Sequence, residues 1–392
     1  CVVISTAVKS DNPEVLEAVE RKIPVIPRAE MLAELMRLKK GVAVAGSHGK
    51  TTTTSMLGQI LRSIDPTVVV GGRLQHWDAS SIVGKGSTFV IEADESDRSF
   101  LRFNPVYTLI TNVDLEHLDN YKDMDDIKNT FLEFINRTAF FGMSWICADC
   151  HQLKSMRASI SKPLKAYGFD SDAELVIRDM EFNQVGSKFR LELEGEDLGI
   201  FEMPVVGKHN VSNAAGAIGM ALSLGVGVNS IKRNLRKFIP ADRRLQRHFQ
   251  SQRFQVIEDY AHHPTEIQAA LEAVRLMGPN NKLIAVFQPH RYTRTKALFP
   301  EFVNCLQKYA DQVLLLPIYA AHEKRIPEVD SVEMAKAVGA KANYHDKIPS
   351  AEDLVQILNA DKMAESSIVF LGAAPLTKLA KGFALELAKI DE

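Results

Sequence analysis

A short stretch of the chain carries the residue types that bind phosphate. An apolar run at 42–45, typical of a buried strand, ends in a turn whose residues are Gly46, Ser47, His48, Gly49, Lys50, Thr51 and Thr52. Glycines let backbone N–H groups point at an anion, and Lys50 adds a positive charge where the next helix begins. Lys50 would reach the terminal phosphates of a nucleotide, and the Thr51 hydroxyl would contact the Mg²⁺ that bridges them. Val44 replaces the first glycine of the strict Gly-x-x-x-x-Gly-Lys-Thr pattern, but the flanking strand and the predicted helix 51–63 favour nucleotide binding over a chance turn.

Acidic residues follow two further predicted strands, at 88–91 and 106–111. Glu92 begins the first acidic run, and His117 lies in the second. Ligands of parallel sheets lie at the carboxyl ends of the strands. A carboxylate and an imidazole there can hold a second divalent ion or position the metal of the phosphates. We therefore select Glu92 and His117 as metal ligands, and a solvated acidic turn is the alternative.

Two polar clusters also follow strands in the second half of the chain. Residues 258–266 follow a predicted strand at 256–257, and residues 288–295 follow one at 283–287. Arg291 and Arg294 lie at the start of a predicted helix and make a site for a carboxylate or a phosphate. A solvent-facing basic turn is the alternative.

Asn210 and Asn213 lie in a stretch, 207–225, that predicts an Ala- and Gly-rich helix. Residues three apart share a helix face, so the two amides could read the edge of an adenine. Capping of the helix by Asn210 is an equally weighted alternative.

The charge balance gives no sign of a polyanionic partner. The chain has 47 Lys and Arg against 49 Asp and Glu, a net charge of −2, so we expect no binding to nucleic acid or to an anionic membrane surface. No run reaches the roughly 18 apolar residues of a spanning helix, and the first residues lack a signal-peptide layout, so we expect no membrane insertion and a cytoplasmic protein. Cys147, Cys150 and His151 partly match a haem or zinc pattern, but no second cysteine pair follows, which favours a packed pair.

The pattern of elements predicts an α/β protein of two or three domains. The chain has 392 residues, and a domain takes about 150. Strands alternate with amphipathic helices, which predicts mainly parallel sheets. Residues 1–40 are too few to bury a sheet, so we expect the remnant of an α/β domain whose start is absent. A second domain is expected at 41–239, with antiparallel strands at 161–204, and a third at 240–392.

Six motifs, in order along the chain, resemble those of the Mur ligases. They are GSHGKTTT (46–53), EADESD (92–97), HLD (117–119), HNVSN (209–213), DYAHHPTE (259–266) and QPHRYTRT (288–295). The resemblance covers essentially the whole chain. It implies a front domain for a UDP-sugar, a central P-loop ATPase and a rear Rossmann-like domain for the incoming amino acid. The glycine-rich motif that begins the front domain is missing, so residues 1–40 would be its closing part.

The last two motifs are similar to those of the family member that acts on UDP-N-acetylmuramate and L-alanine. The resemblance thus implies that ATP and Mg²⁺ serve to join alanine to the lactyl carboxylate of the sugar nucleotide through an acyl phosphate, in peptidoglycan precursor synthesis. Lys50 and Mg²⁺ would neutralise the transferred phosphoryl group.

The same resemblance assigns roles to individual residues. Thr51 would hold one ion, and Glu92 with His117 a second. Asn210 and Asn213 would contact adenine, while Arg244 and Asp259 would close on the nucleotide. The residues expected to hold alanine and the acyl phosphate are Tyr260, His263, His290, Arg291 and Arg294. Those expected to act in catalysis are Lys50, Glu92, His117, His263 and Arg291.

Three other functions stay open. One is a related ligase that attaches a recycled tripeptide to the same sugar nucleotide. Another is a P-loop kinase or plain ATPase, which would not need a second Arg-rich α/β domain. The third is a truncated nucleotide-binding fragment with little ligase activity. The residues predict no oligomeric state.

Overall fold

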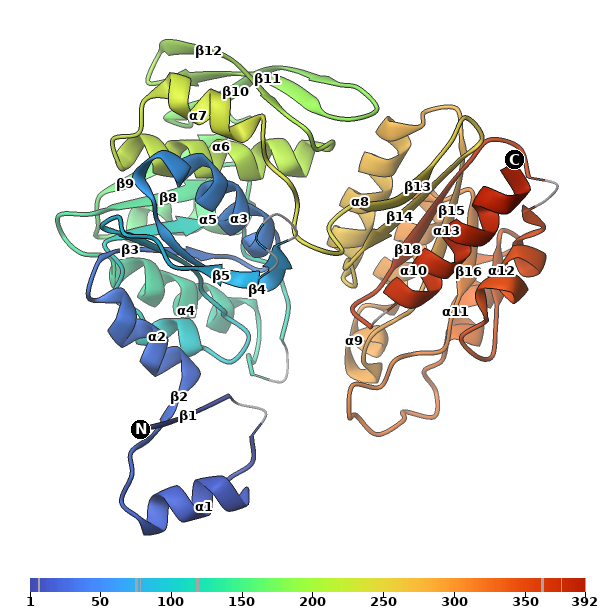
Figure 1. Cartoon of the computed structure of the whole chain (residues 1–392), viewed down its shortest axis with the longest axis horizontal. Helices are drawn as coiled ribbons and strands as arrows, with labels where there is room; N and C mark the ends of the chain where they lie inside the picture. The colour runs from blue at the N-terminus through green and yellow to red at the C-terminus, as the bar shows by residue number, and fades with distance from the viewer. Residues whose placement is uncertain are drawn as a thin grey trace. The chain divides into compact units, whose positions relative to one another are not determined.

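A computed structural model describes residues 1–5, 8–74, 77, 79–117, 120–360, 363–374 and 376–391. The expected α/β class is confirmed, because helices alternate with mostly parallel strands in sheets of two, ten and six strands (Figure 1). Contacts divide the chain into two compact units. The first comprises Cys1–Met180, Lys188–Met203 and Asn210–Ile239, and the second comprises Glu181–Ser187, Pro204–His209 and Pro240–Glu392.

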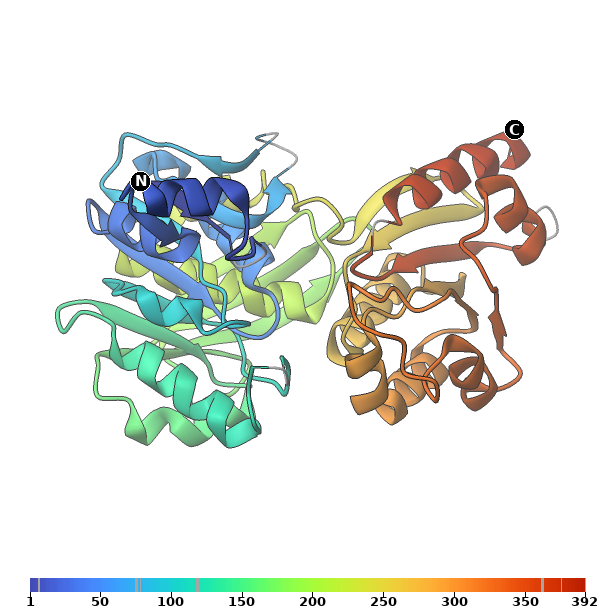
Figure 2. The same ribbon diagram turned by 90° about the horizontal axis from the view of Figure 1, so that it is seen from below.

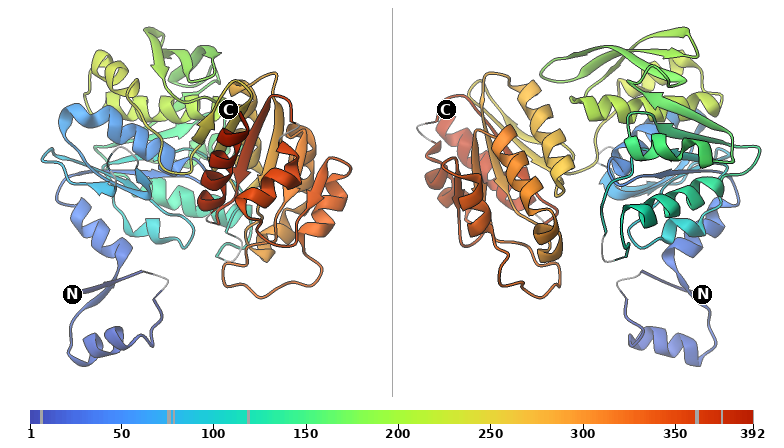
Figure 3. Two further views of the ribbon diagram at one scale, coloured as in Figure 1. Left: turned by 45° about the vertical axis from the view of Figure 1, so that its right-hand side comes forward. Right: turned by 180° about the vertical axis from the view of Figure 1, so that it is seen from behind.

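The first forty residues form a small parallel pair of strands with two helices (Figure 3). Strand β1 (Val2–Ile4) pairs with β2 (Val25–Pro27). Helix α1 (Pro13–Glu20) begins as its sequence predicts, with Pro13 in the first turn and the Asn12 side chain accepting the Glu14 N–H at 2.9 Å. Helix α2 (Arg28–Met36) follows β2.

The ten-stranded sheet of the first unit has β3 in its interior, between β7 and β6. Residues 42–45 of β3 are completely buried, as expected for a parallel strand covered on both faces. The strands are β3 (Lys40–Ala45), β4 (Thr67–Leu74), β5 (Ala79–Ile82), β6 (Thr88–Glu92), β7 (Tyr107–Ile110), β8 (Met143–Cys147), β9 (Leu164–Gly168), β10 (Leu175–Phe182), β11 (Ser187–Leu193) and β12 (Glu196–Met203). The α-helices that accompany this sheet are α3 (Lys50–Ile60), α4 (Met124–Asn136), α5 (His151–Met156), α6 (Lys208–Ser223) and α7 (Val228–Leu235).

One prediction about this sheet is wrong for its first strand. The sequence predicts antiparallel strands over 161–204, but β9 pairs in parallel with both β8 and β10. A helix, α5, crosses between β8 and β9, and such a crossover returns the chain in the same direction. Because α5 has only six residues, its apolar periodicity is too short to be recognised in the sequence.

The second unit is built on a six-stranded sheet in the order β13-β14-β18-β15-β16-β17, parallel except for β13. Ile257 and Ala285 pack beneath α8, α10 and α11, while Val256 and Ile284 pack beneath α12 and α13, because successive side chains of a strand point to opposite faces. Figure 2 shows α13, the red helix that ends at the C-terminus, along one face. The strands are β13 (Gln246–Gln250), β14 (Phe254–Asp259), β15 (Lys282–Phe287), β16 (Gln312–Leu315), β17 (Ala342–Tyr344) and β18 (Ser366–Leu371). The helices are α8 (Pro264–Met277), α9 (Tyr292–Ala297), α10 (Phe299–Tyr309), α11 (Ser331–Val338), α12 (Ala351–Leu358) and α13 (Thr377–Asp391).

The single helix predicted over 293–309 is instead two helices, α9 and α10, separated at Leu298. Pro300 lies in the first turn of α10. Proline has no N–H to donate and its ring clashes with the preceding turn, so a helix starts near it and does not run through it. Within the described residues, no helix combines the length and the apolar character needed to span a membrane.

Candidate active site

The loop after β3 has the backbone of an anion site. Gly46 and Gly49 adopt φ of 135° and 80°, which L side chains rarely adopt. A Cβ on Gly46 would lie 2.1 Å from Thr111 Oγ1, and one on Gly49 would lie 2.7 Å from Asn213 Oδ1. Helix α3 begins at Lys50 without a side-chain cap, so its first N–H groups are directed at the loop, where a phosphate is favoured.

The segment that follows β7 holds this loop in place. Asn112 accepts the His48 N–H at 2.8 Å and donates to the His48 carbonyl at 3.0 Å. Thr111 Oγ1 donates to the same carbonyl at 2.6 Å. Ser47 Oγ accepts the Asp114 N–H at 2.8 Å. The loop is therefore preorganised, and Asn112 is a contributor that the sequence analysis did not select.

The Lys50 side chain folds back over the loop and pairs with a carboxylate. Its Nζ donates to the carbonyls of Gly46 at 2.7 Å and Ser47 at 3.0 Å, and to Glu95 Oε1 at 2.9 Å. Burial disfavours the charged amine, but the negative charge and hydrogen bond of Glu95 outweigh it and raise the pKa of Lys50. Lys50 is therefore positively charged at neutral pH.

His117 belongs to an acidic group that the sequence identifies only in part. Its Nε2 lies 3.3 Å from Glu95 Oε1 and 3.6 Å from Glu116 Oε2. One ligand atom from each of the three lies within 4.8 Å of the others, and two carboxylates with an imidazole suit a divalent cation. The backbone of His117 has φ 56°, a sparsely populated conformation that recurs at functional sites. Leu118 and Asp119 of the same motif lie outside the described residues.

Glu92, the ligand chosen from the sequence, has a different neighbour. Its Oε1 accepts the Thr51 hydroxyl at 2.9 Å, and its Oε2 accepts the Gly71 N–H at 2.7 Å. The metal-capable group that contains His117, as far as the described residues go, includes Glu95 and Glu116 and not Glu92. The spacing of the acidic run could not choose between Glu92 and Glu95.

The two asparagines both lie inside α6 and are buried. Asn210 is the third residue of this helix, so it is not the N-cap. Asn213 lies against Gly49 of the phosphate loop. The helix thus brings one amide to the loop, and adenine contact by either residue stays a prediction.

In the second unit, Asp259 ends β14 and holds the backbone around it. Its carboxylate accepts the N–H groups of Leu245 and Ala261, both at 2.8 Å. Burial raises the pKa of Asp259 to about 6, although the positive charge of Arg244 opposes this. The Arg244 guanidinium lies 5.3 Å from the centre of the Tyr260 ring, a cation–π contact.

Glu258, which was not selected from the sequence, is a fully buried carboxylate beside Asp259 that contacts three side chains. It accepts Arg243 Nε at 2.7 Å and the Thr377 hydroxyl at 2.7 Å, and its other oxygen lies 2.9 Å from His248 Nε2. Arg243 also donates to carbonyls that follow β18. This network fixes the chain just before β13, where Arg244 lies.

A cluster of rings lies at the ends of β14 and β15. The His290 ring stacks on Tyr319 with centroids 5.5 Å apart and lies 5.8 Å from the His262 ring. Arg294 Nη1 lies 3.4 Å from His290 Nδ1. Burial and the two nearby arginines lower the pKa of His290 to about 4. His290 is therefore neutral at neutral pH.

His263 has a separate position, as the N-cap of α8. Its Nδ1 accepts the Thr265 N–H at 3.4 Å, and the residue is 4% exposed. The side chain thus shapes the start of α8. His262, by contrast, was not selected from the sequence although it belongs to the ring cluster, because adjacent histidines in a motif cannot be told apart by spacing.

His262→Gln should reduce the loss of stability in acid. Burial lowers the pKa of His262 to about 3, an effect that Glu266 only partly opposes, whereas its ordinary value is 6.5. Below pH 6.5 the unfolded chain binds a proton at His262 that the folded protein does not bind. The free energy of unfolding is therefore unaffected by this group above pH 6.5 and falls as the pH drops toward 3. At pH 5 the cost is about 2 kcal/mol, at about 1.4 kcal/mol per pH unit. Urea unfolding at pH 7 and pH 5 should show a loss smaller by about this amount in the variant.

His151→Gln is the matched control for this measurement, because His151 is exposed at the start of α5. It should lose as much stability as the wild type. An equal loss in His262→Gln would mean that His262 binds its proton in the folded state.

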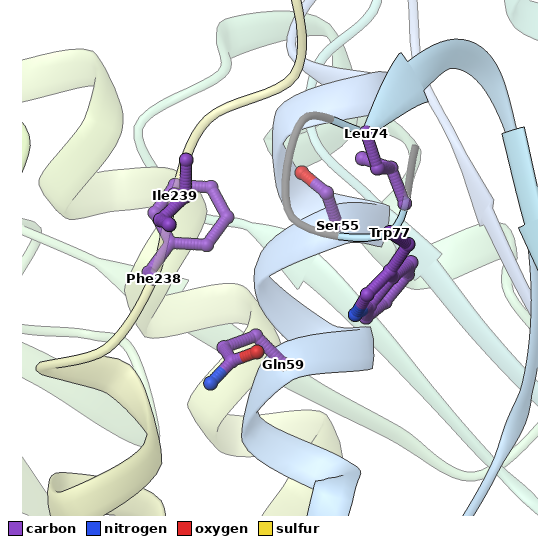
Figure 4. Close-up of a pocket in the computed structure, with 6 residues that line it drawn as sticks. All are labelled: Ser55, Gln59, Leu74, Trp77, Phe238 and Ile239. Carbon is purple, nitrogen blue, oxygen red and sulfur yellow. The ribbon is translucent and has the colours of Figure 1, made fainter. Parts of the chain in front are cut away.

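A separate pocket of about 230 Å³, including space open to solvent, lies beside α3. The indole of Trp77 and the ring of Phe238 stand on opposite sides of it (Figure 4). The Trp77 N–H is buried and has no hydrogen-bond partner among the described residues. The lining residues are Ser55, Gln59, Leu74, Trp77, Phe238 and Ile239. None of them belongs to the phosphate loop.

Three family models match the chain in succession. Residues 1–40 match the Mur ligase family catalytic domain, residues 44–221 the Mur ligase middle domain, and residues 243–374 the Mur ligase glutamate ligase domain.

Curated relatives and a solved structure agree with these matches. A protein of Syntrophotalea carbinolica named UDP-N-acetylmuramate–L-alanine ligase is 42% identical over 393 residues, which cover 100% of this chain and 85% of the relative. One of Aquifex aeolicus with the same name is 41% identical over 98% of this chain and 84% of its own length. The crystal structure of UDP-N-acetylmuramate–alanine ligase from Thermotoga maritima superposes with a TM-score of 0.81 at 26% identity, covering 100% of this chain and 85% of that one. The chain belongs to the Mur ligase family of ATP-dependent ligases.

Proposed function

We propose that this chain joins L-alanine to the lactyl carboxylate of UDP-N-acetylmuramate and converts ATP to ADP and phosphate. The observation that carries the proposal is the phosphate loop with charged Lys50, set beside the group formed by Glu95, Glu116 and His117. A loop of this kind handles a polyphosphate, and the neighbouring oxygen-rich group suits its metal. The names of relatives 40–45% identical to the chain support the choice of substrates.

The reaction has two bond-making steps. The lactyl carboxylate attacks the γ-phosphorus and ADP leaves, which forms an acyl phosphate. The amine of alanine, having lost a proton, then attacks the acyl carbon, and phosphate leaves as the amide forms. In the first step Lys50 would neutralise charge on the transferred phosphoryl group.

Bound Mg²⁺ would neutralise further phosphate charge, and the residues that would hold it are Thr51, Glu92, Glu95, Glu116 and His117. Glu92 accepts the Thr51 hydroxyl, so it would either orient this ligand or share its ion. The carboxylates and the Thr51 hydroxyl fit Mg²⁺ by their chemistry, because Mg²⁺ prefers oxygen ligands, whereas His117 would add a less usual nitrogen ligand.

The second unit would supply the amino-acid site. Arg291 and Arg294 would bind the carboxylate of alanine. The residues around it would be Tyr260, His263 and His290. Arg244 and Asp259 would contact the nucleotide, as would Asn210 and Asn213 from α6. In this proposal residues 1–40 belong to a UDP-sugar domain, 41–239 form the ATP domain and 240–392 form the amino-acid domain.

Phosphate release with UDP-N-acetylmuramate, ATP and each L-amino acid in turn tests the proposal. Release should require the sugar nucleotide and should be fastest with alanine. Release with a tripeptide but not with free alanine would favour the recycling ligase, and release without any amine would favour a plain ATPase.

Arg294→Ala should raise the KM for alanine about tenfold or more and change the KM for ATP little. Arg294 Nη1 lies beside His290, and only the amino acid brings a free carboxylate to this unit. Steady-state kinetics with each substrate varied in turn measures both constants. A larger effect on ATP would assign this arginine to the nucleotide.

A further inference from the structure

A carboxylate of the chain itself already lies where the sequence predicts an anion site. Glu323 Oε1 accepts Arg291 Nε at 2.6 Å and the Thr293 hydroxyl at 2.6 Å. Its Oε2 accepts the Thr293 N–H at 3.0 Å. One side chain from the loop after β16 therefore contacts both Arg291 and the first turn of α9.

The backbone on both sides of this contact is strained. Arg291 has φ 72° and ψ 134°, and Ala321 and His322 have φ of 48° and 71°. Such conformations are sparsely populated and persist only where surrounding contacts impose them. The Arg291 N–H donates to the Tyr319 carbonyl at 2.8 Å, and the Tyr319 N–H donates to the Pro289 carbonyl at 2.8 Å. These bonds and Glu323 tie the two strained segments together.

The contact gives the two arginines different surroundings. Glu323 accepts the Nε–H of Arg291 and offsets its positive charge. Burial disfavours the charged carboxylate, but the hydrogen bonds from Thr293 and Arg291 outweigh it and lower the pKa of Glu323. Arg294 lies one helical turn further on, with Nη1 beside the His290 ring. Its position depends on where α9 begins.

We propose that Glu323 is a positioning residue for the amino-acid carboxylate: it holds Arg291 in its strained conformation and fixes the start of α9, which presents Arg294 to the substrate. The inference rests on the proposed function of this unit. Glu323 itself does not touch the substrate. Its loss therefore acts through the two arginines and through Thr293.

Glu323→Gln in the full chain tests this role, because glutamine keeps the volume and removes the charge. The KM for alanine should rise about tenfold, as expected when a charged hydrogen bond is lost, while the KM for ATP stays within about twofold. Glu328→Gln is the matched control, since its side chain is 80% exposed against 13% for Glu323 and lies 3.7 Å from Lys296. An unchanged or lowered KM for alanine in Glu323→Gln would overturn the proposal, and a lowered one would make Glu323 a competitor of the substrate.

A double-mutant cycle tests whether Glu323 acts through Arg291. In an Arg291→Ala background, Glu323→Gln should raise the KM for alanine by a smaller factor than in the wild-type background, because coupled residues are not additive and only the part that acts through Thr293 remains. Fully multiplicative effects would contradict the proposed coupling.

A readout that needs no activity separates this inference from the proposed function. The Thr293 amide donates to Glu323, so its hydrogen exchange should be faster in Glu323→Gln and unchanged in Glu328→Gln. If the wild-type chain forms no product, the proposed function fails. Thr293 exchange as slow in Glu323→Gln as in the wild type would then overturn the role of Glu323 on its own.

Discussion

Lys50→Ala should lower ATP turnover about a hundredfold while the chain stays folded. Removing a charge that acts on the transferred phosphoryl group costs on the order of 3 kcal/mol of transition-state stabilisation. Lys50 is 14% exposed and its amine lies 2.7 Å from Glu95 Oε2, so the variant removes a largely buried positive charge from the loop. Glu95 keeps His117 as a neighbour, which limits the loss of stability. Phosphate release measures the turnover, and the far-ultraviolet circular dichroism spectrum shows whether the chain stays folded.

Lys154→Ala is the control for this variant. Lys154 is 54% exposed and pairs with Asp170 on the surface of the same unit, and such pairs contribute little. Turnover should be unchanged in it. Near-normal turnover in Lys50→Ala would mean that the loop does not handle the reacting phosphate.

Glu95→Gln should weaken divalent-metal binding on the order of a hundredfold, and more than Glu92→Gln does. Glu95 lies beside His117 and Glu116, whereas Glu92 accepts the Thr51 hydroxyl and a backbone N–H. Glutamine at 95 removes a charged metal ligand, whereas glutamine at 92 keeps an acceptor for the Thr51 hydroxyl. Complete loss of a residue that contacts a metal ligand typically costs about 10–100-fold in metal affinity or activity. Titration with Mn²⁺ in the presence of ATP, followed by electron paramagnetic resonance, measures the affinity without turnover.

Comparing Glu95→Gln with Glu92→Gln decides which of the two carboxylates binds the metal. If Glu92→Gln has the larger effect, the choice made from the sequence is right and Glu95 serves mainly as the partner of Lys50. If both effects are large, the ion near Thr51 and the one near His117 depend on each other.

Features that depend on neighbouring residues could be predicted from the sequence. The phosphate loop is one example, because the strand, the glycines and Lys50 follow one another within a few residues. The alternation of strands and helices predicted parallel sheets for the same reason. The start of α1 at Asn12 and Pro13 is equally local.

Features that depend on side-chain direction or on distant segments could not be predicted. Glu92 and Glu95 lie in one acidic run, and only the turn after β6 decides which carboxylate faces His117. Glu323 lies 32 residues from Arg291 and belongs to no recognisable pattern. The break between α9 and α10 is, in contrast, a local feature that Pro300 signals, and the helical periodicity of 293–309 masks it.

The pocket beside α3 has an optical consequence. The chain has two tryptophans, and they lie in unlike surroundings. Trp145 is 1% exposed and donates to Ser223 at 2.9 Å, so its emission is shielded from solvent. Trp77 lines the open pocket, with the Arg62 guanidinium 5.6 Å from its ring. Because α3 starts at Lys50 and also lines this pocket, the unmodified chain carries a fluorophore beside the helix that begins at the phosphate loop, with a second one as an internal reference.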